Sequence, residues 1–187
     1  MKKQAAPLRL RSGIKLYAQI FAKEVPMPDK VKAVPEGFHT LTPHITVRDA
    51  PRAIDFYQKA FGAEVLGIHD GPEGKIMHAT LKIGDSMLML NDEFPEWGAL
   101  GPPSTGASGV IIHMYLENVD AAFQRVVSAG ATVKMPLGDA FWGDRYGAVV
   151  DPFGHTWSLA SKVRDVSKDE LDKASQDMFG RGTKKSA

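Results

Sequence analysis

Two short stretches decide the fold: AFGAEV at residues 60–65 and SAGATV at residues 128–133. In each, a helical pattern ends at a glycine, Gly62 or Gly130, and a run with strand composition begins directly afterwards. Glycine is common just past the end of a helix because it adopts the left-handed backbone conformation without strain. The same helix-to-strand junction therefore occurs twice, which predicts a duplicated structural unit.

The sequence around the first junction predicts a βαβββ module over residues 39–92. Residues 41–47 alternate between mostly apolar and polar side chains, which is the period of a half-buried strand. A helix over 51–61 follows, with Asp49 as its N-cap. The three later strands are expected at residues 64–69, 75–83 and 86–90, separated by the turn-forming runs DGPEG and GD.

The second junction lies in a module with the same order of elements, over residues 109–161. Its helix is expected to begin at Asn118 or Asp120 and to end at Ala129. Its strands are expected at residues 110–116, 132–136, 145–150 and 155–160. The stretch between the modules, 93–108, has three prolines and several glycines and is interpreted as a linker.

These patterns predict an α+β fold of two tandem βαβββ modules. The modules would form a curved mixed sheet with a concave cup and helices on the outer face, because one module alone leaves a sheet face uncovered. They make up one domain over residues 37–162. Residues 163–187 are expected to form a C-terminal helix and a polar tail.

Residues 1–36 are expected to be an N-terminal extension. An amphipathic stretch that includes Ile14, Tyr17, Ile20 and Phe21 has helical spacing, so it would dock on the domain or on a partner. The alternative is a frayed arm. A secretory signal is a weaker interpretation of the basic start, because no small-residue cleavage pattern follows.

Composition limits the classes of function. The 187 residues include no cysteine, which excludes disulfides, thiolate nucleophiles and cysteine-based zinc sites. Lys and Arg total 23 against 22 Asp and Glu, so no global charge draws the chain to nucleic acid or membrane. No apolar run approaches the roughly 18 residues that cross a bilayer. We expect a cytoplasmic protein that binds a small molecule, with no nucleic-acid or membrane partner.

Three motifs follow one another in the chain. They are AIDFYQKAFGA at 53–63, NVDAAF at 118–123 with AGA at 129–131, and DPFGH at 151–155. Together they resemble the vicinal-oxygen-chelate superfamily of glyoxalases, bleomycin-resistance proteins and dioxygenases, over residues 39–161. Gly143-Asp144-Arg145 is similar to its PhnB-like branch. The resemblance implies a small-molecule cup, often with a divalent metal, and a homodimer in which the cup forms within one chain or across two.

The resemblance also implies where a metal would bind: a His or Gln on the first strand of each module and a Glu on each last strand. His44 and His113 lie on the first strands, about two residues beyond the positions that the family uses, which are Thr42 and Ile111 here. His78, on a third strand, is a further donor candidate.

The carboxylates of the family's metal site are missing from this sequence. Its glutamate positions correspond to Leu88 or Met89 in the first module and to Ser158 in the second. Since ligand number determines metal affinity, no four-ligand site of the usual type is expected. The alternative is a divalent metal held by His44 and His113, and no cofactor is certain.

Seven side chains are the candidates for ligand binding. They are His44, His78, His113, Tyr115, Trp142, Arg145 and Ser158. The apolar neighbours of His113 are expected to face the helices, which turns His113 and Tyr115 toward the cup. Arg145 would clamp a carboxylate or phosphate, or else form an ion pair with Asp144 or Asp151. No catalytic residue is assigned.

The sequence therefore predicts a glyoxalase-like small-molecule-binding protein, and two interpretations stay open. One is a lyase, isomerase or dioxygenase-type enzyme on a small oxygen-rich substrate, with acid–base or weakly metal-assisted chemistry by His44, His78 and His113. The other is a metal-free sequestering protein of the bleomycin-resistance type, with an aromatic and methionine-lined groove. Inward-facing histidines favour the enzyme, and the missing carboxylates favour the binder.

Overall fold

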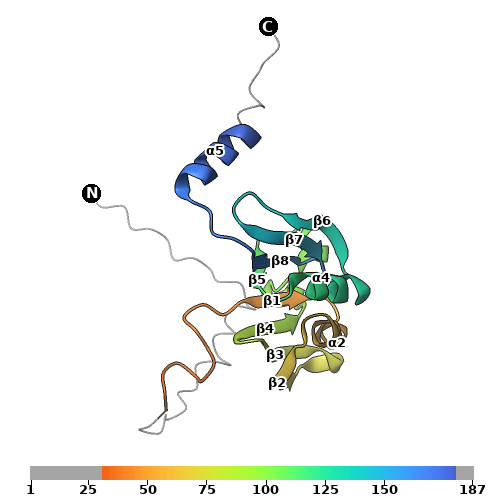
Figure 1. The fold of residues 1–187 in the computed structure, drawn as a ribbon. Helices are drawn as coiled ribbons and strands as arrows, with labels where there is room; N and C mark the ends of the chain where they lie inside the picture. The colour runs from red at the N-terminus through yellow and green to blue at the C-terminus, as the bar shows by residue number, and fades with distance from the viewer. Residues whose placement is uncertain (1–30, 180–187) are drawn as a thin grey trace, which may run out of the picture.

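The computed structural model describes residues 31–179 and contains two tandem βαβββ modules (Figure 1), so the predicted α+β fold is confirmed. Module one consists of β1 (His44–Val47), α2 (Ala50–Phe61), β2 (Glu64–Asp70), β3 (Ile76–Ile83) and β4 (Ser86–Asp92). Module two consists of β5 (Ile111–Tyr115), α4 (Val119–Ser128), β6 (Thr132–Asp139), β7 (Asp144–Val150) and β8 (Thr156–Lys162). The amphipathic stretch expected near the N-terminus and the end of the polar tail lie outside the described residues.

Each module builds its own four-stranded mixed sheet. The strand orders are β1-β4-β3-β2 and β5-β8-β7-β6, so the expected curved surface consists of two sheets. In both, the first strand of the module pairs in parallel with the last strand, and the remaining pairs are antiparallel. The strands β1 and β5 are consequently edge strands at equivalent places in the two modules.

The helix α2 forms where the sequence has both its start and stop signals. The Asp49 side chain accepts a hydrogen bond from the backbone N–H of Arg52 at 3.3 Å, and Gly62 ends the helix with φ 68°. Its buried face packs on α4 of module two, where the guanidinium Nε of Arg125 donates to the carbonyl of Ala60 at 2.9 Å. The two helices thus join the modules on one side of the molecule.

The buried carboxylate of Asp151 connects the modules more tightly. Its Oδ2 accepts hydrogen bonds from the hydroxyl of Tyr57 at 2.8 Å and from the indole Nε1 of Trp157 at 2.9 Å. Its Oδ1 accepts from the backbone N–H groups of Phe153 and His155, both at 2.9 Å. Tyr57 belongs to module one, and the other residues belong to module two. The carboxylate of Asp151 therefore holds the Tyr57 side chain of module one within the core of module two.

The linker between the modules is packed rather than loose. It contains two short helices, Pro95–Trp97 and α3 (Pro102–Thr105). A Cβ at Gly101 would lie 2.8 Å from the carbonyl oxygen of Thr46, and a Cβ at Gly154 would lie 2.7 Å from Pro102. These approaches bring the linker between β1 and the turn before β8, so glycine is required at both positions.

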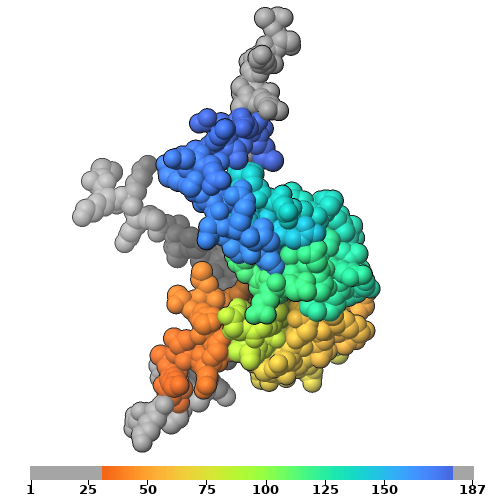
Figure 2. Space-filling view, viewed as in Figure 1, coloured from red at the N-terminus to blue at the C-terminus, as the bar shows by residue number. Residues whose placement is uncertain are grey.

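After β8 the chain leaves the modules and forms α5 (Lys168–Phe179), which projects from them in Figures 1 and 2. Ser167 and Glu170 form a capping box: the hydroxyl of Ser167 accepts from the N–H of Glu170, and the carboxylate of Glu170 accepts from the N–H of Ser167. No helix within residues 31–179 has the length and apolar character needed to cross a membrane.

Replacing Tyr57 by Phe should destabilise the fold by about 1.5–3 kcal/mol, because it removes a hydrogen bond to a buried charged group. Tyr57 is fully buried, and burial, together with the negative charge of Asp151, raises the pKa of its hydroxyl well above the ordinary value. Urea unfolding measures the loss. The matched control is Tyr115→Phe, whose hydroxyl also bonds to an aspartate but whose side chain is 64% exposed. Equal losses in the two variants would contradict the role given to Tyr57.

Candidate ligand-binding site

The sheet of module two presents polar and aromatic side chains on the face away from its helix. Along β5, His113 and Tyr115 are exposed, while Ile112 and Met114 turn toward the core, so the predicted alternation is confirmed. His113 lies beside Ser158 of β8, and its Nδ1 is 2.7 Å from the hydroxyl of Ser158. Ser158 is only 2% exposed, so the imidazole covers a buried hydroxyl and is fixed by it.

Tyr115 and Trp142 meet on the carboxylate of Asp144, the first residue of β7. The hydroxyl of Tyr115 donates to Oδ2 at 3.1 Å, and the indole Nε1 of Trp142 donates to the same oxygen at 3.0 Å. The hydrogen bond to Asp144, and then its negative charge, raise the pKa of Tyr115. Tyr146 lies between the two groups, with its ring stacked on His113 and edge-on to Trp142 at centroid distances of 6.1 and 5.5 Å.

These contacts define a continuous cluster, which we call the aromatic face. It consists of His113, Tyr115, Trp142, Asp144, Tyr146 and Ser158. Four of these residues were expected from the sequence. Asp144 and Tyr146 were not expected as site residues, although their positions on alternate residues of one strand place them on the same side of the sheet.

Module one carries three histidines on the corresponding side of its sheet, which we call the histidine face. The ring of His78 on β3 lies 5.4 Å from that of His44 on β1 and 6.1 Å from that of His69 on β2. Burial lowers the pKa of His78, and the positive charges that His44 and His69 can carry lower it further. His69 was missed because nothing in the sequence of its strand marks it, whereas the pairing of β2 with β3 places it opposite His78.

Arg145 does not belong to the aromatic face. Its guanidinium lies 2.6 Å from a carboxylate oxygen of Asp120 on α4 and 3.1 Å from one of Asp139. These bonds raise its pKa. The sequence predicted an ion pair as one of two roles for Arg145. The structure has an ion pair, but the partners of Arg145 are neither Asp144 nor Asp151. Residues next to each other in a strand point to opposite sides, so Arg145 faces the helix while Asp144 faces the ligand side.

The residues present do not fit the four-ligand metal site of the family. The hydroxyl of Ser158, at one glutamate position, is already bonded to His113. The one carboxylate on β4, Asp92, is 5% exposed and accepts hydrogen bonds from the backbone N–H groups of Ala50 and Ile76, both at 2.8 Å. Between residues 31 and 179 no group of three or more His, Cys, Asp or Glu side chains is arranged to hold a metal ion.

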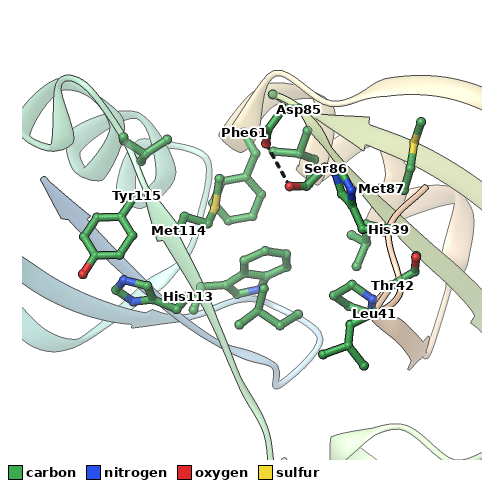
Figure 3. Close-up of a pocket in the computed structure, with 17 residues that line it drawn as sticks. His39, Leu41, Thr42, Phe61, Asp85, Ser86, Met87, His113, Met114 and Tyr115 are labelled. Carbon is green, nitrogen blue, oxygen red and sulfur yellow. Dashed lines mark hydrogen bonds between the residues drawn. The ribbon is translucent and has the colours of Figure 1, made fainter. Parts of the chain in front are cut away.

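A cavity of about 480 Å³ opens beside the aromatic face. Figure 3 shows His113 and Tyr115 of β5 on one side of it, and Thr42, Ser86 and Met87 on the other. Phe61 lies between these two walls in Figure 3. Trp157 also lines the cavity, and both side chains are buried. The volume is in the range of small-molecule pockets, roughly 300–1,000 Å³.

Comparisons with known proteins agree with this architecture. Residues 37–159 match the sequence profile of the Glyoxalase/Bleomycin resistance protein/Dioxygenase superfamily. A Mycobacterium tuberculosis protein, Rv0887c, is 51% identical over 137 residues, which cover 72% of this chain and 81% of that protein. The name of that relative states no activity.

Solved structures show the same fold. Protein PA1353 from Pseudomonas aeruginosa is 27% identical with a TM-score of 0.55, over 66% of this chain and 98% of that one. A PhnB protein from Bacillus cereus, described as a putative 3-demethylubiquinone-9 3-methyltransferase, is 20% identical with a TM-score of 0.53, over 66% and 99% of the two chains. At that identity the second match shows the fold alone, and it confirms the resemblance to PhnB-like proteins at that level.

The histidine face should make the stability of the fold depend on pH. Because the pKa of His78 is lower in the folded chain than the ordinary 6.5, the unfolded chain binds more protons as the pH falls through this region. The free energy of unfolding should therefore carry the full contribution of His78 above pH 6.5 and lose it as the pH falls, because the folded chain disfavours protonation of this ring. Since solvent screens the partly exposed ring, the loss should stay below about 1 kcal/mol.

NMR titration of the His78 ring measures this pKa directly. His44→Ala should raise it toward the ordinary value by removing a neighbouring positive charge. The exposed His39, replaced by Ala, serves as the control and should leave it unchanged. A His78 pKa above 6.5 in the native chain would show that the cluster does not exist as described.

Proposed function

Since the chain belongs to the Glyoxalase/Bleomycin resistance protein/Dioxygenase superfamily, we propose that it is a small-molecule-binding protein that holds a planar organic compound without the family's four-ligand metal site. The hydrogen bond of 2.7 Å between His113 and Ser158 carries this proposal. A serine stands where the family's second glutamate is expected, and its hydroxyl is buried and occupied by the histidine. The pair therefore forms a fixed wall rather than half of a metal site.

The aromatic face supplies what a planar ligand requires. Aromatic rings attract other rings in stacked or edge-on arrangements, and they present a large apolar surface with little conformational freedom to lose. His113, Tyr146 and Trp142 already make such contacts with one another, and the adjoining cavity reaches His113 and Tyr115. A flat compound placed on this face would stack on rings that are held in place by hydrogen bonds.

The proposed cup closes across two copies of the chain, with the aromatic face of one opposite the histidine face of the other. Both β1 and β5 are edge strands, and an edge strand can pair with a strand of a second chain. Large apolar side chains beside them are exposed: Leu41 is 87% exposed, Ile111 57% and Tyr115 64%. A homodimer would cover these side chains and enclose the ligand.

A second candidate function is an acid–base enzyme of the lyase or isomerase type on an oxygen-rich substrate. The fixed orientation of His113 favours it, because Ser158 holds one ring nitrogen and leaves Nε2 for a substrate proton. Turnover that disappears in His113→Ala, while ligand binding persists, distinguishes this function from binding alone.

Isothermal titration with 1-naphthalenemethanol, a neutral planar probe, tests the binding proposal. We expect binding by the native chain and a loss of roughly tenfold in affinity in Tyr146→Ala, because a ring contact to the ligand disappears. Tyr146→Phe is the matched control and should retain most of the affinity, since the ring remains. Unchanged affinity in Tyr146→Ala would refute binding on the aromatic face.

Light scattering on the same samples tests the dimer. The proposal predicts twice the mass of one chain at micromolar concentration. A monomer at that concentration would refute the cup across two copies and leave the aromatic face as a binding surface within one chain.

A further inference from the structure

One carboxylate oxygen of Asp144, at the centre of the aromatic face, has no hydrogen-bond partner among the described residues. The residue is 4% exposed, and both of its hydrogen-bond donors, Tyr115 and Trp142, bind Oδ2. Its Oδ1 is buried and has no hydrogen-bond partner among residues 31–179. Buried polar atoms in folded proteins nearly always have a partner, so this oxygen requires an explanation.

No neighbouring cation among residues 31–179 provides the missing partner. Arg145, next in sequence, is bonded to Asp120 and Asp139 on the other side of the sheet. Lys162 lies opposite Asp144 in the register of β7 and β8, but its side chain is exposed and no ion pair within the described residues includes Asp144.

The backbone around Asp144 is held firmly. The carbonyl of Asp144 accepts from the N–H of Ala140 at 2.7 Å, and the carbonyl of Gly143 accepts from the N–H groups of Val163 and Arg164 at 2.9 and 3.1 Å. A Cβ at Gly143 would overlap the carbonyl oxygen of Arg164, so the segment after β8 lies directly on this turn. The backbone position of Asp144 is therefore fixed, and the hydrogen bonds from Tyr115 and Trp142 to Oδ2 hold its side chain.

Tyr115 is the most movable group on the carboxylate. Its side chain is 64% exposed, and its hydroxyl bond to Asp144 is the one hydrogen bond that this side chain makes within residues 31–179. Rotation of this ring away from β7 would open the carboxylate to a ligand from the side of His113 and the cavity. Trp142 and Tyr146, which contact each other edge to face, would remain as walls.

We propose that Asp144 anchors a positively charged nitrogen of the ligand, so that the compound is an aromatic amine salt whose ring lies on the aromatic face. This inference rests on the proposed binding function and specifies its ligand class. A protonated amine carries donors for the free carboxylate oxygen, and charge-assisted bonds of this kind are the strongest hydrogen bonds in proteins. The faces of Trp142 and Tyr146 add a cation–π attraction. On binding, the ammonium group donates one N–H to the free Oδ1 of Asp144 and a second to Oδ2, where it takes the place of the hydroxyl of Tyr115.

A matched probe series tests the charge preference by isothermal titration at neutral pH. The series is 1-naphthylmethylamine, 1-naphthalenemethanol and 1-naphthoate, which share a ring system and differ in charge. The native chain should bind the amine at least about tenfold more tightly than the alcohol, and the carboxylate most weakly. Asp144→Asn should remove the preference for the amine. Asp139→Asn, the same change at an exposed acid on the helix side, should retain it.

Equal affinity of the native chain for the amine and the alcohol, or a preference that survives in Asp144→Asn, would overturn this inference and leave the binding function standing. No binding of any of the three probes would count against both. If Asp144→Asn does not fold, Tyr115→Phe provides the test, because it removes the hydroxyl that competes with the amine for the carboxylate of Asp144 and changes only an exposed side chain. It should raise the ratio of the affinity for the amine to the affinity for the alcohol, and an unchanged or lower ratio would overturn the proposal.

Discussion

The carboxylate of Asp151 is the point on which the arrangement of the two modules depends. It receives the hydroxyl of Tyr57 from module one and the indole of Trp157 from module two, in a core where none of the three side chains is more than 4% exposed. Hydrogen bonds to charged groups contribute about 1.5–3 kcal/mol each, and an unpaired buried charge costs more. These bonds therefore stabilise the observed packing of the two modules, with α2 against α4.

This rigid frame allows the opposite sides of the sheets to carry groups that folding does not need. In the core, Asp151 and Asp92 have both oxygens bonded to the protein. On the aromatic face, Asp144 has one buried oxygen without a partner among the described residues. The contrast distinguishes the acids that hold the fold from the acid that we propose binds a ligand.

Much of the fold could be predicted because its signals are local. The glycines that end the helices, and the alternation that turns His113 and Tyr115 outward, depend on neighbours in sequence. Less of the site could be predicted, because its contacts join strands far apart in the chain. The bond of Tyr115 to Asp144 exists because β5 and β7 flank β8, and the contact of His69 with His78 depends on the register of β2 and β3. The side on which Arg145 lies depends on where β7 begins, since a shift of one residue reverses the face.

We propose that the aromatic face binds a small molecule without the four-ligand metal site of the family. The metal content of the full chain, after incubation with Mn²⁺, Ni²⁺ or Zn²⁺ and removal of free ions, tests this most directly. The donor set predicts far less than one ion per chain, with no difference between the native chain and the His44→Ala and His113→Ala variants. One tightly held ion per chain, lost in both variants, would contradict it.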